Sequence, residues 1–165
     1  MLKPGFEKQI NLEECRRAEE RESAVHKIRA KIRFDYQGRA RPSRFFFGKK
    51  STEEAATELR QQQAALWRNV PVQGILIEDL EMGEIYFVFD DDIGAEVAYA
   101  PLELEVWADS LCYLVRFAVR EEFRRLKIME PTQISLSMQD MEQVFFEVHD
   151  QAKTQVMLKA RKYLD

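Results

Sequence analysis

Apolar and charged residues alternate most regularly in the stretch IRAKIRFDY, residues 28–36. Every second residue is apolar, from Ile28 to Tyr36, and the residues between them are charged. A period of two with β-branched and aromatic residues predicts a strand with one buried face and one face in water. The prediction can be tested directly, because a helix over the same residues would scatter the charges around a cylinder.

A second short strand is predicted at residues 44–47, RFFF, after a turn that contains glycine and proline. The next residues, STEE at 51–54, have a hydroxyl followed three positions later by a carboxylate. This pattern is typical of a capping box, in which the two side chains satisfy the first free amides of a helix. The helix is expected to run to about Arg68, where Asn69 and Pro71 are stop signals.

Three strands are predicted in the middle of the chain. Residues 74–80 and 84–90 are expected to pair with each other around a tight turn. The run IYFVF, residues 85–89, is apolar at every position, which is typical of a central strand that is covered on both faces. Residues 96–107 predict a further strand, in which Pro101 indicates a bulge or an edge position.

The last third of the chain predicts a helix, a strand and a second helix. Asp109 is predicted to cap an amphipathic helix whose apolar face comprises Leu111, Leu114, Val115, Ala118, Val119 and Leu126. After Pro131, alternation over residues 134–138 predicts a last strand. Residues 139–163 predict a long helix, about 36 Å in length. Its main apolar stripe comprises Met141, Val144, Phe145, Val148, Ala152, Val156 and Tyr163.

These elements predict an α+β fold. Hairpins dominate and strands do not alternate strictly with helices, which favours a largely antiparallel sheet of five to six strands with helices packed on it and a long C-terminal helix. A single domain over residues 1–165 is expected, with a peripheral, highly charged N-terminal helix within residues 1–24. The N-terminus has no signal-peptide pattern, no run of about 18 apolar residues occurs, and the two cysteines form no motif. A cytoplasmic protein without membrane contact is therefore expected.

The charged residues are unevenly distributed, with a basic segment in an otherwise acidic chain. Nine residues from Lys27 to Lys50 are basic and only Asp35 is acidic, so this segment carries about +8 in a chain of net charge −4. The whole chain has 25 bases and 29 acids, which leaves 16 bases and 28 acids elsewhere. The candidate residues for binding a partner or a nucleic acid are Lys27, Arg29, Lys31, Arg33, Arg39, Arg41 and Arg44.

Three interpretations of this basic segment remain open. A positive sheet face beside the aromatic residues 45–47 could hold the phosphates and stack the bases of single-stranded nucleic acid. An acidic partner protein could bind the same face. Alternatively, a neighbouring strand that carries Glu103 and Glu105 would neutralise the cations through cross-strand pairs, and the surface would then be a mixed, solvated one.

The remaining polar residues suggest no catalytic constellation. Asp90, Asp91 and Asp92 lack the spacing of a calcium loop, and neither His26 nor His149 belongs to a metal-ligand or nucleophile motif. Cys112 adjoins an apolar helix face and is expected to be a small buried hydrophobe. No catalytic residue, metal or cofactor is therefore expected.

The last helix adds an interface hypothesis. Outside its main stripe it carries further apolar residues, which a second copy of the chain could cover: Phe146, Met157, Leu158 and Leu164. The leading hypothesis is a small cytoplasmic interaction or regulatory protein without catalytic activity, which acts through protein partners, with a homodimer as one form. The alternative is binding of RNA or single-stranded nucleic acid through the basic hairpin, residues 27–50.

Overall fold

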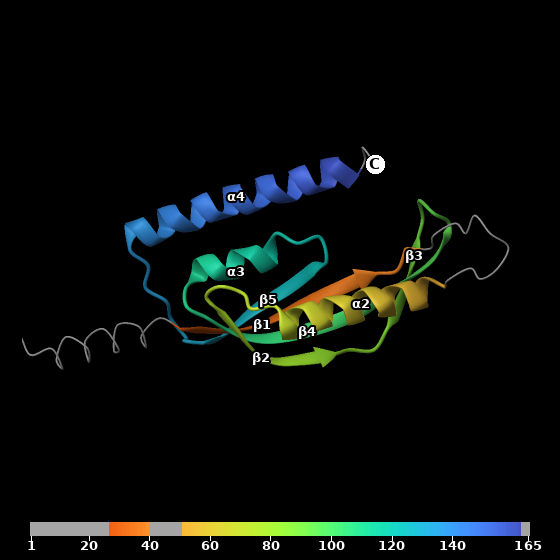
Figure 1. Ribbon diagram of the computed structural model, residues 1–165, viewed down its shortest axis with the longest axis horizontal. Coiled ribbons are helices and arrows are strands. Elements are labelled where there is room, and N and C mark those ends of the chain that lie inside the picture. The colour runs from red at the N-terminus through yellow and green to blue at the C-terminus, as the bar shows by residue number, and fades with distance from the viewer. Residues whose placement is uncertain (1–26, 40–50, 163–165) are drawn as a thin grey trace, which may run out of the picture.

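The computed structural model describes residues 27–39 and 51–162. Within these ranges the chain forms a five-stranded antiparallel sheet with three helices, the last of them long (Figure 1). The predicted α+β fold is thereby confirmed. The predicted N-terminal helix and the predicted strand 44–47 lie outside the described residues. None of the described helices is long and apolar enough to cross a membrane.

The sheet has the strand order β2-β4-β1-β5, and β3 pairs with the first part of β4. The strands are β1 (Ile28–Gln37), β2 (Ile75–Met82), β3 (Tyr86–Asp90), β4 (Ala95–Ala108) and β5 (Phe123–Glu130). β4 is the longest strand, and it pairs with β1 on one side and with β2 and β3 on the other. The central position of β1 and β4 places their apolar faces in the middle of the core.

The alternation predicted for β1 is confirmed. Its apolar side chains face the helices and are buried, whereas the charged ones alternate on the other face. The helices α2 (Thr52–Asn69) and α3 (Leu111–Ala118) cover the apolar face. The Phe34 ring lies 6.1 Å from that of Trp67 on α2 and 6.2 Å from that of Phe117 on α3, measured between centroids. The opposite face of the sheet carries no described helix, and we call it the open face.

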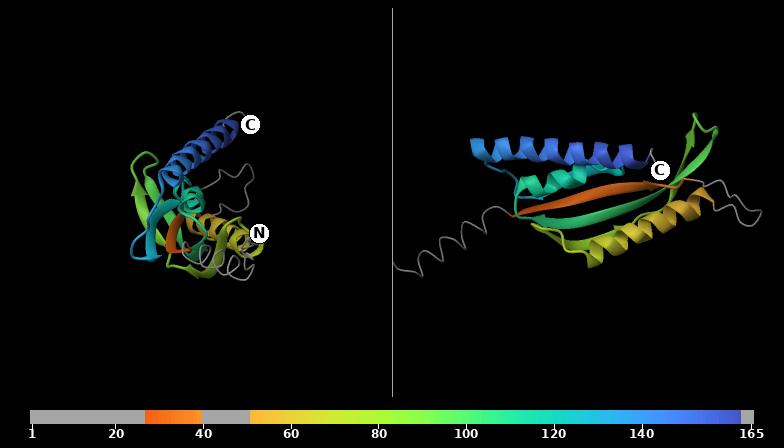
Figure 2. Two further views of the ribbon diagram at one scale, coloured as in Figure 1. Left: turned by 90° about the vertical axis from the view of Figure 1, so that its left-hand side faces the viewer. Right: turned by 45° about the horizontal axis from the view of Figure 1, so that its top comes forward.

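The third helix, α4 (Met138–Lys162), packs on the outer side of α3 and extends past its end (Figure 2). Its start is determined locally, since the Ser137 hydroxyl accepts a hydrogen bond from the Asp140 amide at 3.1 Å and the Asp140 carboxylate accepts one from the Ser137 amide. The predicted capping box at Ser51 and Glu54 is also present. Both predicted long helices are therefore confirmed.

The predicted hairpin between β2 and β3 is wrong. Both strands run in the same direction along β4, with Ile75 opposite Ala108 and Tyr86 opposite Tyr99. The chain reverses instead between β3 and β4, where Gly94 has a positive φ of 66°. β2 and β3 are thus two parts of one long edge, interrupted at Gly83.

Pro101 lies in a central strand, so of the two predicted alternatives, a bulge or an edge, the edge position is wrong. Three residues of the paired edge, 83–85, stand opposite only two of β4, 100–101, so the pairing is irregular here. Its carbonyl accepts a hydrogen bond from the Gly83 amide at 3.1 Å, which shows that this residue faces the interruption between β2 and β3. The nitrogen of a strand residue points to the same side as its carbonyl, so the missing N–H also faces the interruption. The proline therefore removes no regular bond from the sheet.

Two predictions for the last third are also wrong. The helix expected to be capped by Asp109 and to reach Leu126 has Ser110 at its N-cap and ends at Ala118. Residues 123–130 form β5, which pairs with β1. The strand expected at residues 134–138 is absent, since 133–137 are irregular. The sequence pattern did not predict β5 because this strand has two register shifts against β1. Such shifts interrupt the alternation of apolar and polar residues that marks a strand.

The buried Tyr36 hydroxyl predicts a loss of stability at alkaline pH. Tyr36 is fully buried, and burial raises its pKa to about 12. The unfolded tyrosine ionises near pH 10, so between about pH 10 and pH 12 the unfolded state binds fewer protons and the free energy of unfolding falls, by about 2 kcal/mol. Urea unfolding at several pH values should show this fall, and Tyr36→Phe should remove it.

The same variant has a simple control at neutral pH. Among the described residues the Tyr36 hydroxyl has the Trp67 indole as its polar side-chain neighbour, and the two do not form a hydrogen bond of regular geometry. Tyr36→Phe should therefore change the free energy of unfolding at pH 7 by no more than about 0.5 kcal/mol. An unchanged alkaline slope in the variant would show that another group causes it.

Candidate functional site

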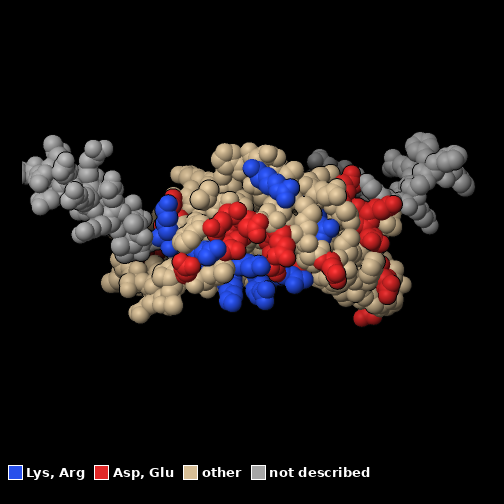
Figure 3. Space-filling view, turned by 90° about the horizontal axis from the view of Figure 1, so that it is seen from below, with Lys and Arg blue, Asp and Glu red and all other residues tan. Residues whose placement is uncertain are grey.

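The basic strand β1 lies between an acidic strand and a basic one. Lys31 is opposite Glu105 of β4 on one side and Lys127 of β5 on the other. Arg33 is likewise opposite Glu103 and Arg125. The open face is therefore divided along its length, with carboxylates over β2 and β4 and cations over β1 and β5. Figure 3, which looks from the side opposite α4, shows these two groups side by side.

Most cations of the open face are paired. Lys31 lies 2.8 Å from Glu103, whose hydrogen bond and charge raise the pKa of this lysine. Arg29 pairs with Glu105, with Glu78 at 3.1 Å and with Glu130 at 3.4 Å. Altogether five cations, Arg29, Lys31, Arg33, Arg124 and Arg125, pair with six carboxylates, Asp35, Glu78, Glu81, Glu103, Glu105 and Glu130. This face is nearly neutral, which matches the interpretation of cross-strand neutralisation.

The predicted basic residues are not brought together as one site. Arg29, Lys31 and Arg33 share the open face, and Lys27 is exposed just before it. Arg39 pairs with Glu121 at 3.2 Å, beyond the end of β1. Two other candidates, Arg41 and Arg44, lie outside the described residues.

A buried carboxylate joins four strands at one end of the open face. Asp35 of β1 is only 4% exposed. It accepts hydrogen bonds from Arg33 at 2.9 Å and from the Tyr86 hydroxyl at 2.7 Å, and its other neighbour is Arg124 at 3.5 Å. Tyr86 stacks on Tyr99 of β4 with ring centroids 5.4 Å apart. We call these five residues the Asp35 network; it fixes β3 and β5 relative to the centre of the sheet.

The Asp35 network also affects the tyrosine that it contains. Burial, followed by the hydrogen bond to Asp35, raises the pKa of Tyr86. The Tyr86 hydroxyl therefore keeps its proton and remains a donor to the carboxylate at neutral pH. No described residue in this network has the free nucleophile or the adjacent base of a catalytic site. Its arrangement supports a structural function.

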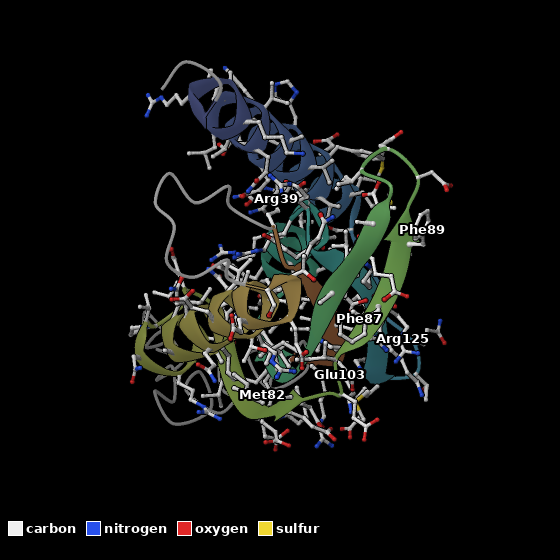
Figure 4. The ribbon with its side chains drawn as sticks, turned by 90° about the vertical axis from the view of Figure 1, so that its right-hand side faces the viewer. Arg39, Met82, Phe87, Phe89, Glu103 and Arg125 are labelled. Carbon is white, nitrogen blue, oxygen red and sulfur yellow. The ribbon has the colours of Figure 1, made fainter. Side chains whose placement is uncertain are left out.

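The strand β3 is an exposed apolar edge, so its predicted central position is wrong. Phe87, Val88 and Phe89 are 46–59% exposed, and Ile93 in the following turn is 65% exposed. Among the described residues, β3 pairs only with β4, which leaves its other edge without a strand. Figure 4 looks onto this end of the molecule and shows Phe87 and Phe89 along the projecting hairpin. We call Phe87, Val88, Phe89 and Ile93 the β3 edge.

The surroundings of the β3 edge are acidic. Residues 69–115 contain eleven Asp or Glu and no Lys, Arg or His. The nearest carboxylates in sequence, at Glu84, residues 90–92 and Glu96, belong to no ion pair between described residues. Figure 3 shows acidic side chains at the end where β3 lies. This 47-residue stretch without a cation is a sequence signal of the acidic surface around β3.

The turn beside the β3 edge is held by its own side chains. Asp90 accepts hydrogen bonds from the amides of Asp92 at 3.0 Å and Ile93 at 3.3 Å. The described residues contain no group of three His, Cys, Asp or Glu side chains that could hold a metal ion. The carboxylate of Asp90 thus stabilises the turn.

The interface residues predicted on the last helix are exposed where they are described. Phe146, Met157 and Leu158 on α4 are 48–69% exposed, and Leu164 lies outside the described residues. His149, on the same helix, is exposed as well. Cys112 on α3 is half-buried, and burial raises the pKa of its thiol. A raised pKa reduces the thiolate fraction, as expected of a packed rather than a reactive cysteine.

Comparisons with known proteins identify no relative from which a function could be inferred. No family model matches the chain, no curated protein matches it, and no solved structure matches it.

Proposed function

We propose that this protein binds other proteins and that its binding surface is the β3 edge. An extended segment of a partner would add to the open side of β3 as a further strand, with backbone hydrogen bonds and with apolar contacts to Phe87 and Phe89. The observation that carries the proposal is an apolar edge strand with no covering element among the described residues. Edge strands of this kind are normally shortened, charged or covered unless they bind something.

The charge around β3 indicates the chemistry of the partner. The carboxylates near the hairpin, which form no ion pair with another described residue, attract cations and repel acidic chains. We infer that the partner segment alternates apolar residues with Lys or Arg. The Asp35 network supports such a role because it holds β3 in place before a partner arrives, which lowers the entropy lost on binding.

Binding of nucleic acid through β1 has less support. Arg29, Lys31 and Arg33 all pair with carboxylates, so a polyanion would have to displace Asp35 and several glutamates. Retention of a single-stranded oligonucleotide at about 50 mM salt, lost in Lys31→Glu, would favour this alternative over the β3 edge.

The cytoplasm remains the proposed compartment, with support from Cys112, a free thiol.

A designed peptide tests the proposal. A labelled peptide of alternating valine and lysine should bind, because it matches β3 in strand pattern and opposes its surroundings in charge. The double variant Phe87→Ser, Phe89→Ser should raise the Kd at least about tenfold, since it removes the apolar contacts. Fluorescence anisotropy measures the affinity, and amide chemical shifts should change along residues 86–96.

Two controls separate strand addition from simple attraction of charge. A peptide in which proline replaces each valine has the same charge and cannot form a strand, so it should not bind. Leu66→Ser on α2 removes an apolar side chain that is as exposed as Phe87, and it should leave the affinity unchanged. Equal binding of the valine and proline peptides would contradict the proposal.

A further inference from the structure

The helix α4 packs on α3 through mostly polar side chains. Its half-buried residues are Val144, Glu147, Gln151 and Gln155, which recur at spacings of three and four and so lie on one side. Gln151 donates a hydrogen bond to Glu147 at 2.9 Å within this row. Three of the four residues are polar, although the side of a surface helix that meets its protein is normally the apolar one.

The apolar side of α4 faces solvent. We call it the α4 stripe: Met138, Met141, Phe145, Val148, Ala152 and Val156. All six are exposed, the five large ones by 42–77%. The spacing of three and four residues is that of a coiled-coil seam, and the stripe extends over about 27 Å. An exposed row of this length marks an interaction surface, because monomers rarely leave so many large apolar side chains in water.

The charges of α4 indicate what covers the stripe. The first half of the helix carries four acids, Asp140, Glu142, Glu147 and Asp150. The second half carries Lys153, Lys159 and Arg161. A second α4 in antiparallel orientation would place each acidic half beside a basic half, whereas a parallel one would place like charges together.

We propose that two copies of the chain associate through the α4 stripe as an antiparallel, two-fold symmetric pair. A two-fold axis brings the same surface of each copy together, so one apolar row covers the other without leaving a free end. The small Ala152 lies near the middle of the charge pattern and allows the two helices to approach closely. This inference uses α4 alone and does not depend on the β3 edge.

Substitutions that introduce charged side chains into the α4 stripe test the association. Sedimentation equilibrium at micromolar concentration should give about 39 kDa, twice the mass of the 19.5 kDa chain. Phe145→Glu with Val156→Glu should reduce the mass to that of one chain, because each dimer would then bury four unpaired carboxylates. Circular dichroism checks that the variant keeps its helices. A parent protein that sediments as a monomer would overturn the proposal.

The same helix offers a matched control. Phe146 and Met157 are also large, apolar and exposed, but they lie about a third of a turn away from the stripe. Phe146→Glu with Met157→Glu should therefore leave the dimer intact. Dissociation by this pair, with a dimer retained in Phe145→Glu with Val156→Glu, would place the interface on the side of Phe146 and overturn the proposed stripe.

A charge exchange tests the orientation. Glu142→Lys should weaken the dimer because the new lysine would face the partner's Lys153, and Lys153→Glu should weaken it in the same way. The two substitutions together should restore the affinity. Within one chain these residues are about 16 Å apart along the helix, beyond the screening length of about 8 Å, so restoration reports contact between copies. A double variant weaker than either single variant would exclude the antiparallel arrangement.

Discussion

Replacing Asp35 with asparagine should lower the free energy of unfolding by about 2–3 kcal/mol. The buried carboxylate is the counterion of Arg33 and Arg124 and the acceptor of the Tyr86 hydroxyl. Asparagine has nearly the same shape, so the loss would come from charge and hydrogen bonding rather than from packing. Both arginines are at least a third exposed, which lets water replace part of the lost interaction and keeps the expected cost at this level.

Urea unfolding monitored by tryptophan fluorescence provides the measurement. Glu130→Gln is the matched control, since Glu130 is an exposed partner of Arg29 at 3.4 Å and should cost no more than about 0.5 kcal/mol. Tyr86→Phe should lie between the two, at about 1 kcal/mol, because it removes one hydrogen bond. If Asp35→Asn were no more damaging than the control, the Asp35 network would not be holding the strands together.

Arg60→Ala should lower the free energy of unfolding by about 3 kcal/mol. Arg60 lies on the buried side of α2, and its guanidinium donates to the carbonyls of Gly83 at 2.6 Å and Pro101 at 3.3 Å. These carbonyls lie at the interruption between β2 and β3, where the regular bonds of the sheet stop. Burial lowers the pKa of Arg60, which has no carboxylate partner among the described residues.

Two further variants divide this cost into packing and hydrogen bonding. Arg60→Met keeps most of the volume but leaves the two carbonyls without a donor, so it should cost about 1–2 kcal/mol. Arg68→Ala removes an exposed arginine from the same helix and should change stability by less than about 0.5 kcal/mol. Equal stability of Arg60→Ala and Arg68→Ala in thermal unfolding would show that the bonds to Gly83 and Pro101 contribute nothing.

Arg60 is also a structurally important residue that the sequence pattern does not reveal. The buried residues of α2 are Ala56, Arg60 and Ala64, one helical turn apart. The two alanines let the helix approach β4 closely, and the arginine fills the space between the helix and the interrupted edge. In the sequence this arginine resembles any solvated cation of a helix, because its acceptors, the carbonyls of Gly83 and Pro101, lie more than 20 residues away.

The central position predicted for β3 is wrong for a related reason. A run such as IYFVF has no strongly polar position. The same pattern therefore fits a central strand that is covered on both faces and an edge strand that binds a partner. The neighbours of a strand decide which of the two it is, and they come from distant parts of the chain. The absence of cations from residues 69–115 was the only local sign of an unusual surface.

The sequence by itself determined the features that depend on a few neighbouring residues. The pleat of β1, the capping box at Ser51, and the extent of α2 and α4 follow from periodicity and from hydrogen bonds within one turn. Only the tertiary structure decided that β1 lies between an acidic and a basic strand, that β3 is an edge, and that the apolar side of α4 faces outward. Strand order, register and helix docking depend on contacts between residues far apart in the chain, for which a local pattern contains no information.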